Sequence, residues 1–275
     1  MYVLIIVGIL ALGLDAYLTY LICVNTAWFH FYSGVIMGYP IFLLIYLLFV
    51  VFLFIWGLFF NKKKETTKPN RFYYGILRQT DSSFLSILRI KIKFRGQEKM
   101  PKGRYLIIQN HRSNFDQMVM LKAIKEHPLV CITKPENLDF PIAGPFIHHS
   151  GFIPINRDDM REGIKATEKA ASYIENDLAS IAISPEGTRN KTDSLLLPFH
   201  PGSFNIAYLA KCPIVVSSLK DTDKIKNRAF FRRTKVYFSI LEVIPYEKYK
   251  DMKPSELATY CRDLIYLDLK RKEHF

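Results

Sequence analysis

The chain has 275 residues, of which 49% are hydrophobic, and its formal net charge is +13 at pH 7. That length and apolar content allow a large buried core and favour one large domain with attachments. The four cysteines are scattered without a C-x-x-C pair, which excludes a disulfide framework or a zinc site as the organising feature. The basic surplus favours a polyanionic partner: nucleic acid, an anionic membrane surface or a phosphorylated substrate.

The first 60 residues contain no lysine or arginine and a single acidic residue, Asp15. Residues 1–24 and 40–60 are apolar runs, each long enough to cross a hydrocarbon core of ~30 Å as a helix. A cleaved signal peptide, the alternative for the first run, would have a basic start and a shorter apolar stretch. We therefore predict a membrane anchor of two hydrophobic helices over residues 1–60. Whether the pair spans the bilayer or forms a shallow hairpin is left open.

A cluster of three lysines, Lys62 to Lys64, follows the second apolar run directly. The positive-inside rule then predicts a cell-membrane protein whose remaining chain lies on the cytoplasmic side. Residues 61–70 are polar, include a proline, and are typical of a linker. Residues 71–275 form the predicted catalytic domain, whose basic surplus would attract anionic membrane lipids. The predicted membrane anchor disfavours nucleic acid as the polyanionic partner.

Apolar residues recur at helical spacing over residues 71–88. That pattern fits an amphipathic helix at the membrane surface or a helix that faces the core of the domain, and both remain open. Residues 89–95 alternate basic and apolar side chains, which predicts a half-buried strand ended by Gly96.

From residue 105 onward, short apolar runs alternate with helical patterns. We predict strands at 105–108, 129–132, 152–155, 180–184, 214–216 and 235–244, and helices at 114–126, 160–178, 202–211 and 255–272. This alternation indicates an α/β fold with a mixed sheet flanked by helices. In such sheets functional groups gather at the carboxyl ends of strands, where loops lead into helices.

His111 and Asp116 lie at the first of these strand ends. A histidine can take a proton from a hydroxyl if a carboxylate orients its ring and stabilises the imidazolium. Five residues along a continuous helix would place the two side chains about 140° apart, but a loop position for His111 lets them meet. The alternative is structural, because Ser113-x-x-Asp116 is also a helix capping box. We expect Asp116 to pair with one partner, His111, rather than with the Ser113 backbone.

Two arginines follow other predicted strands. Arg157 comes after the strand at 152–155, and Arg189 ends the Pro185–Arg189 segment, in which Gly187 permits close backbone approach. The guanidinium fork suits phosphate oxygens.

Four blocks occur in order: Asn110-His-x4-Asp116, Gly151-Phe-Ile-Pro-Ile-Asn-Arg157, Pro185-Glu-Gly-Thr-Arg189, and Cys212-Pro-Ile. This arrangement resembles the glycerolipid acyltransferases, and most closely the bacterial-type 1-acylglycerol-3-phosphate acyltransferases. The resemblance covers roughly residues 70–245. Two departures bear on substrate preference: no second proline follows Pro213, and Ser184 stands where an aromatic residue is common.

The resemblance implies a role for each matching residue. His111 would be the general base and Asp116 its orienting partner, while Arg157 and Arg189 would hold the substrate phosphate. Glu186 would bind a glycerol hydroxyl or organise Arg189. The remaining substrate-binding candidates are Asn110, Lys134, Gly187, Thr188 and Pro213, the last along the acyl site.

The implied reaction moves an acyl group from acyl-CoA or acyl-carrier protein to the free hydroxyl of 1-acylglycerol-3-phosphate, giving phosphatidic acid. No metal or further cofactor is expected. Two alternatives remain: a different lysophospholipid or lyso-lipid acceptor, and a catalytically silent lipid-binding or scaffold protein on the same fold.

Overall fold

The computed structural model describes residues 66–156, 159–228 and 232–271, together with isolated positions between 13 and 55. The two apolar runs of the predicted anchor lie almost entirely outside the described residues, as does most of the linker. Within the described ranges, no helix combines the length and apolar character needed to cross a membrane.

Within the described ranges, seven strands form one mixed sheet. They are β1 (Ile90–Arg95), β2 (Leu106–Ile108), β3 (Leu129–Thr133), β4 (Ile153–Pro154), β5 (Ser180–Ile183), β6 (Ile214–Lys220) and β7 (Thr234–Ile244). Their spatial order is β1-β7-β6-β2-β5-β3-β4. All neighbours are parallel except β6 and β7, which are antiparallel. The predicted mixed α/β sheet is therefore confirmed.

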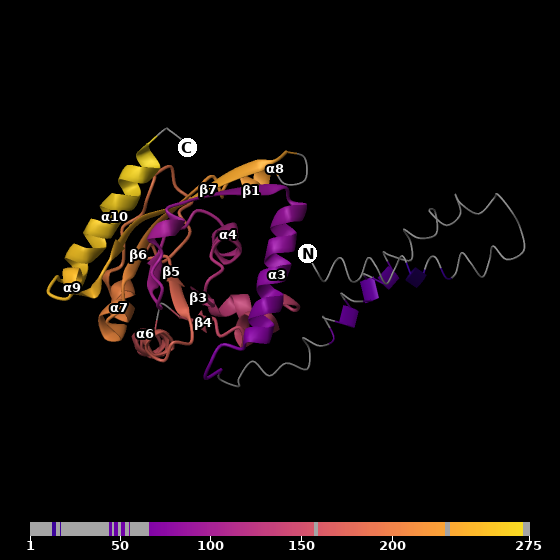
Figure 1. Ribbon diagram of the computed structural model, residues 1–275, viewed down its shortest axis with the longest axis horizontal. Helices are drawn as coiled ribbons and strands as arrows, with labels where there is room; N and C mark the ends of the chain where they lie inside the picture. The colour runs from indigo at the N-terminus through magenta and orange to yellow at the C-terminus, as the bar shows by residue number, and fades with distance from the viewer. Residues whose placement is uncertain are drawn as a thin grey trace, which may run out of the picture.

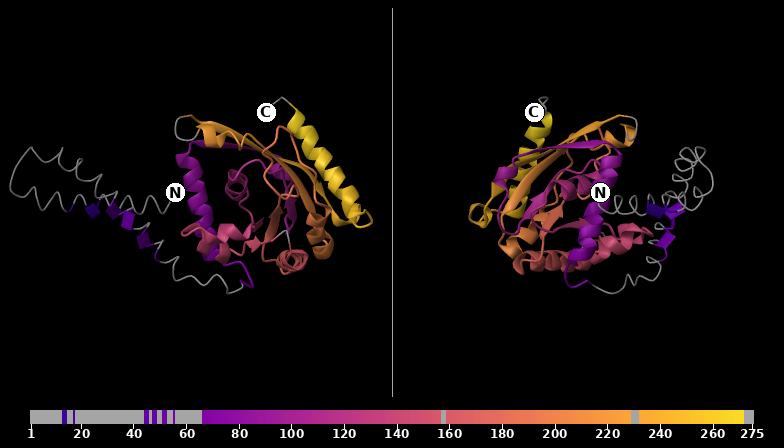
Figure 2. Two further views of the ribbon diagram at one scale, coloured as in Figure 1. Left: turned by 180° about the vertical axis from the view of Figure 1, so that it is seen from behind. Right: turned by 45° about the vertical axis from the view of Figure 1, so that its right-hand side comes forward.

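Helices cover both faces of the sheet (Figures 1 and 2). The longer helices are α3 (Arg71–Ile87), α4 (Phe115–Ala123), α5 (Ala143–His149), α6 (Met160–Glu175), α7 (Asn205–Ala210) and α10 (Pro254–Lys270). Short helical turns complete the set: η1 (Gln97–Lys99), η2 (Pro135–Asp139), η3 (Pro201–Phe204), α8 (Ile225–Arg228) and α9 (Tyr246–Tyr249). Helix α3 packs with α4 and α5, α6 packs with α7, and α10 packs on β6 and η3. Figure 1 shows α3 and α10 on opposite sides of the sheet.

Helix α3 decides between the two predictions made for residues 71–88. It begins at Asn70, whose side-chain oxygen accepts hydrogen bonds from the amides of Phe72 and Tyr73, as an N-cap does. Its inner face buries Tyr74, Leu77 and Leu85 in the core of the domain. The helix therefore faces the core, while its outer face keeps exposed apolar side chains.

Strand β6 runs four residues beyond the predicted end at residue 216. The sequence breaks its apolar run at Ser217 and Ser218, yet both are buried. The Ser217 hydroxyl donates to the Ile108 carbonyl at 2.8 Å, and the Ser218 hydroxyl donates to the Asp268 carboxylate at 2.6 Å. Because both hydroxyls are paired, these serines continue a central strand that hydropathy alone ends too early.

We predict that Gly96→Ala destabilises the domain. Gly96 has φ +78°, and an added Cβ would lie 2.5 Å from the Ile240 carbonyl oxygen. A left-handed backbone and a clash with main chain together cost about 1–3 kcal/mol, so the thermal unfolding midpoint of the full chain should fall by several degrees. Gly103→Ala is the control, since an added Cβ there meets nothing within 4 Å. Equal midpoints for the two variants would contradict the role given to Gly96.

Candidate active site

The carboxyl ends of four parallel strands bring most of the predicted residues to one edge of the sheet. His111 follows β2, Lys134 follows β3, and the Pro185–Arg189 segment follows β5. Arg157 follows β4 in sequence and lies outside the described residues. Since β2, β5, β3 and β4 are successive neighbours, their following loops meet at this edge.

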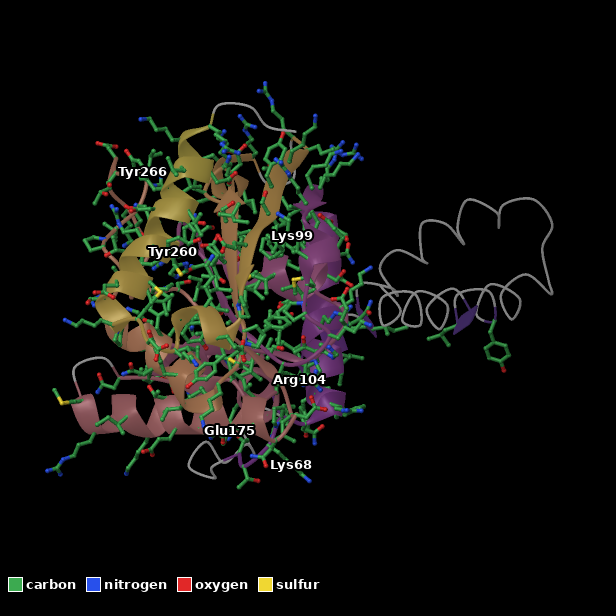
Figure 3. The ribbon with its side chains drawn as sticks, turned by 60° about the vertical axis from the view of Figure 1, so that its left-hand side comes forward. Lys68, Lys99, Arg104, Glu175, Tyr260 and Tyr266 are labelled. Carbon is green, nitrogen blue, oxygen red and sulfur yellow. The ribbon has the colours of Figure 1, made fainter. Side chains whose placement is uncertain are left out.

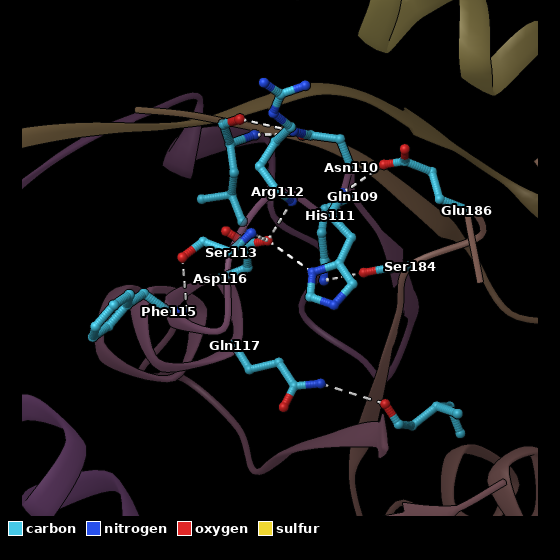
Figure 4. Close-up of polar contacts among 12 residues, drawn as sticks. Gln109, Asn110, His111, Arg112, Ser113, Phe115, Asp116, Gln117, Ser184 and Glu186 are labelled. Carbon is cyan, nitrogen blue, oxygen red and sulfur yellow. Dashed lines mark hydrogen bonds and ion pairs between the residues drawn. The ribbon is translucent and has the colours of Figure 1, made fainter. Parts of the chain in front are cut away.

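The His111 and Asp116 side chains form a close pair (Figure 4). Nδ1 of His111 lies 2.8 Å from Oδ2 of Asp116. The Asp116 side chain is fully buried, whereas 20% of the His111 side chain is exposed. An ionised carboxylate only accepts hydrogen bonds, so this network assigns a proton to Nδ1, and none of the described residues forms a hydrogen bond with Nε2.

Asp116 also accepts hydrogen bonds from the backbone that precedes helix α4, so the expectation that it serves only one partner was wrong. The same Oδ2 atom accepts hydrogen bonds from the backbone amides of Arg112 at 2.8 Å and Ser113 at 2.9 Å. The Ser113 hydroxyl in turn accepts from the Phe115 amide at 3.3 Å. The two readings are compatible because a tight turn aims both amides and the imidazole at one carboxylate oxygen. The two backbone hydrogen bonds hold the Asp116 carboxylate in place for His111.

The main chain of His111 is bonded on both sides by the segment after β5. Its amide donates to Oε1 of Glu186 at 2.6 Å, and its carbonyl accepts from the Asn190 amide at 2.7 Å. Asn190 is itself buried, and its side chain bonds to Thr192 and Ser194 within its own loop. Asn190 is a residue that the sequence reasoning missed, because its position directly after the arginine carries no signal of a main-chain contact across the sheet.

Glu186 is 2% exposed and bonds to main chain through both carboxylate oxygens. Its Oε2 accepts from the Leu197 amide at 2.9 Å, so the side chain joins the His111 loop to the segment before η3. Burial raises the pKa of the Glu186 carboxyl, and the two backbone donors oppose that rise. Its contacts are those of a residue that positions the His111 loop. The predicted contacts with a glycerol hydroxyl or with Arg189 remain predictions.

The Pro185–Arg189 segment turns sharply after β5. The Gly187 amide donates to the Ser184 carbonyl at 3.0 Å, and Gly187 adopts φ +72°, a conformation that favours glycine. Pro185 occupies the second position of this turn, where its fixed φ is favoured. The turn directs Glu186 inward to His111 and leaves Thr188 and Arg189 exposed.

Asn110 completes the ladder between β2 and β6. Its side-chain nitrogen donates to the Leu219 carbonyl, and its side-chain oxygen accepts from the Leu219 amide, both at 2.8 Å. The side chain is fully buried. These two hydrogen bonds to main chain give Asn110 a structural role, and its contact with substrate stays a prediction.

Pro213 lies away from the His111 pair, and its place along the acyl site stays a prediction. It precedes the first residue of β6, and its carbonyl accepts from the amide of Leu106 at the start of β2. His111 lies five residues after Leu106, so about 16 Å of extended strand and loop separates the two positions. The fourth block marks the start of a strand, and the start of β6 lies at the opposite edge of the sheet.

A groove opens beside the Pro185–Arg189 segment. Its volume is about 660 Å³, its lining surface is mainly apolar, and it is formed by β3, β5, α6, η3, α7 and the loops after β4 and β5. Ile132, Ile155 and Ile183 line it, as do Ser184 and Gly187. Gln109, two residues before His111, donates to the Ser184 hydroxyl at 3.1 Å, so a residue of the groove lining contacts the segment that leads to His111.

Residues 91–220 match the family model described as Acyltransferase. The chain therefore contains an acyltransferase-family domain. The family resemblance read from the four blocks is thereby confirmed, and the matched range holds His111, Asp116 and the Pro185–Arg189 segment of this acyltransferase domain.

Curated relatives and a solved structure agree with that family. A 1-acyl-sn-glycerol-3-phosphate acyltransferase of Saccharomyces cerevisiae is 29% identical over 188 residues, which is 67% of this chain and 61% of that protein. An enzyme of the same name from Haemophilus influenzae is 28% identical over 70% of this chain and 79% of its own. The crystal structure of the 1-acyl-sn-glycerophosphate acyltransferase of Thermotoga maritima superposes with a TM-score of 0.60 at 19% identity, covering 82% and 91% of the two chains, and shows a shared fold.

We predict that Glu186→Ala loosens the His111 loop without unfolding the domain. The change leaves the buried amides of His111 and Leu197 without acceptors, which costs about 1–3 kcal/mol for each. Hydrogen–deuterium exchange should accelerate roughly tenfold or more in peptides covering 109–117 and 195–199. Glu136→Ala, at an exposed position in η2, is the matched control. Unchanged protection of both peptides in Glu186→Ala would contradict the role assigned to this carboxylate.

Proposed function

We propose that the protein is a membrane-anchored 1-acylglycerol-3-phosphate O-acyltransferase, which makes phosphatidic acid in phospholipid biosynthesis. The observation that carries the proposal is the His111–Asp116 pair, whose Nε2 atom has no hydrogen-bond partner among the described residues, at a strand-end edge shared with the Pro185–Arg189 segment. The names of the curated relatives support the choice of substrate.

In the proposed reaction, Nε2 of His111 takes the proton from the free hydroxyl of the acceptor as its oxygen attacks the thioester carbonyl. The carbon–oxygen bond forms and the carbon–sulfur bond breaks, so the acyl group passes to the acceptor in one enzyme-bound complex. The thiolate leaves and receives the proton from the His111 imidazolium. Asp116 stabilises that imidazolium and fixes the ring, so neither a covalent enzyme intermediate nor a metal is needed.

The acceptor phosphate would bind at the exposed end of the Pro185–Arg189 segment. Arg189 is exposed next to the turn that carries Glu186, and no described residue forms a hydrogen bond or ion pair with its guanidinium. Arg157 and Lys134 follow the neighbouring strands and would add positive charge to the same edge. A guanidinium and a phosphate form paired hydrogen bonds, which fix position as well as charge.

The groove lined by Ile132, Ile155 and Ile183 is suited to an acyl chain, because burying methylene groups against apolar side chains is favourable. Its proximity to Ser184 and Gly187 would place the chain end that reacts near His111. Acyl-CoA and acyl-carrier protein are both donors that present such a chain as a thioester.

The N-terminal apolar runs and the following lysines support a location at the cell membrane, with the catalytic domain on the cytoplasmic side. Another lysophospholipid acceptor is compatible with the same pair and groove. A catalytically silent lipid-binding protein is disfavoured, since a pure binder has no use for an imidazole oriented by a buried carboxylate.

The proposal is tested by offering the purified full chain a panel of lysolipids with acyl-CoA and acyl-carrier-protein donors. We expect the highest kcat/KM with 1-acylglycerol-3-phosphate and little transfer to acceptors that lack a phosphate. A clear preference for another head group would overturn the assigned acceptor.

We predict that His111→Ala lowers kcat by a factor of about 10² to 10⁴, the range expected for loss of a general base. The fold should persist, because the bonds to Glu186 and Asn190 involve only the backbone of residue 111. His127→Ala removes a partly exposed imidazole at the opposite edge of the sheet and should retain full activity. Normal acyl transfer by His111→Ala would contradict the assignment of His111 as the general base.

We also predict that Arg189→Ala raises the KM for 1-acylglycerol-3-phosphate roughly tenfold to a hundredfold, since hydrogen bonds between charged groups contribute about 1.5–3 kcal/mol. The KM for a 1-acylglycerol without phosphate should not change. Arg271→Ala, at an exposed position after α10, is the charge-matched control. An equal rise in KM for both acceptors would contradict the assignment of Arg189 to the phosphate site.

A further inference from the structure

Strands β1 and β7 form a ribbon that extends beyond the rest of the sheet. The last residue of β6, Lys220, pairs with Tyr237, whereas β7 already begins at Thr234, which pairs with Ile90 of β1. The first three residues of β7 therefore extend about 10 Å past β6 and pair only with β1. Because β7 is antiparallel to β6, and β6 is parallel to β2, this extension lies at the edge that carries His111. We name residues 89–93 and 232–237 the β1–β7 arm.

The arm and its flanks carry a strong positive charge. Segments 89–95 and 220–235 together contain eleven basic residues and two acidic ones, and of the basic residues Lys220 pairs with Asp268 of α10. One of the two acids, Asp221, already pairs with Lys224 at 2.7 Å. Lys91 lies beside Lys235 in the strand register, and both are exposed, as is Lys93. Like charges in register repel, so this arrangement favours binding of a polyanion.

Exposed apolar side chains border the arm where α3 ends. Ile87 is 51% exposed and Phe84 is 42% exposed, just before the chain enters β1. Phe84 stacks on Phe115 with ring centroids 6.4 Å apart, and Phe115 directly precedes Asp116. An apolar surface thus leads from the base of the arm to the His111 loop. Figure 3 shows nitrogen-bearing side chains gathered at the end of the molecule where α3 meets the β1–β7 ribbon.

We propose that the β1–β7 arm, with the exposed end of α3, binds the anionic headgroups of a lipid bilayer and holds the His111 edge against the leaflet. Charge alone would also suit nucleic acid or an acidic carrier protein. Basic side chains next to exposed aliphatic and aromatic ones are typical of a bilayer interface, where the charges meet headgroups and the apolar groups enter the acyl boundary. The inference rests on the proposed function, which requires an acceptor lipid to reach His111 from that leaflet.

The test compares two triple variants of the full chain that remove the same charge. The arm variant carries Lys91→Gln, Lys93→Gln and Lys235→Gln. The control variant carries Lys102→Gln, Lys211→Gln and Lys250→Gln, three exposed positions at the opposite edge of the sheet. Flotation measures the partition of each protein onto neutral phosphatidylcholine vesicles and onto vesicles rich in phosphatidylglycerol at low salt. Both vesicle types are needed because the apolar N-terminal runs would bind either one.

Each basic side chain near an anionic surface contributes roughly fivefold to partition. We therefore expect the partition of the arm variant onto anionic vesicles to fall at least about tenfold, and its partition onto neutral vesicles to stay unchanged. The partition of the control variant should stay within about twofold of the parent on both. Equal partition of the arm variant and the parent on anionic vesicles would overturn the proposal. The same two variants are also tested for binding of soluble acyl-carrier protein and of single-stranded DNA. If the arm variant lost only one of those activities and kept its partition onto anionic vesicles, the arm would recognise that partner and the proposal would be overturned.

Acyl transfer to acceptor dispersed in detergent separates this inference from the proposed function. The arm variant should keep the parent rate there, because no bilayer is present and the His111 pair is untouched. If neither protein transfers an acyl group, the proposed function fails, while the vesicle measurement still decides whether the arm binds an anionic surface.

Discussion

The hydrogen bonds between the His111 backbone and the segment after β5 are the constraint on which the rest of the site depends. Glu186 accepts from the amide of His111, and Asn190 donates to its carbonyl. With the backbone held on both sides, the turn from residue 112 to 116 can aim two amides and the imidazole at one oxygen of Asp116. The orientation of the imidazole therefore follows from the sheet order, which makes β2 and β5 neighbours.

Polar side chains buried in the sheet support the same edge from the other side. Asn110 extends the pairing of β2 with β6 through the backbone of Leu219. On either side of Leu219, Ser218 and Lys220 both contact Asp268 of α10, at 2.6 and 3.3 Å. Each group is paired, so burial costs little and the contacts favour one register of the strands. The C-terminal helix thereby braces the strand to which the His111 loop is anchored.

The spacing of apolar residues and the turn residues predicted most of the fold from the sequence. A helix or strand that is buried on one face carries apolar residues at a regular spacing. The strands at 105–108 and 129–132 and the helix at 160–178 appear within a few residues of their expected bounds. Helix α5 was missed, since seven residues with a glycine and a proline show no helical period. Strand β6 was predicted too short because hydropathy does not register that Ser217 and Ser218 have hydrogen-bond partners.

The site was predicted less completely than the fold, for a physical reason. His111 and Asp116 could be paired from sequence because the two residues are close along the chain. The contact of Glu186 with His111 joins residues 75 positions apart and ends on main chain, which leaves no trace in the pattern of side chains. The bonds of Asn110 were missed for the same reason, since its partner is also main chain. The position of Pro213 could not be read from the sequence, because a sequence block does not say at which edge of the sheet it lies.

Strand β1 forms one border of the sheet, and the backbone on the border of such a strand can pair with another extended chain. Alternation along this strand places Lys91, Lys93 and Arg95 on the outer face and Ile92 and Phe94 toward the core. A second copy of the chain that approached this border would bring an identical row of positive charges against the first. The same lysines that suit the arm to an anionic surface would thus keep the protein from joining sheets with its neighbours when many copies crowd together.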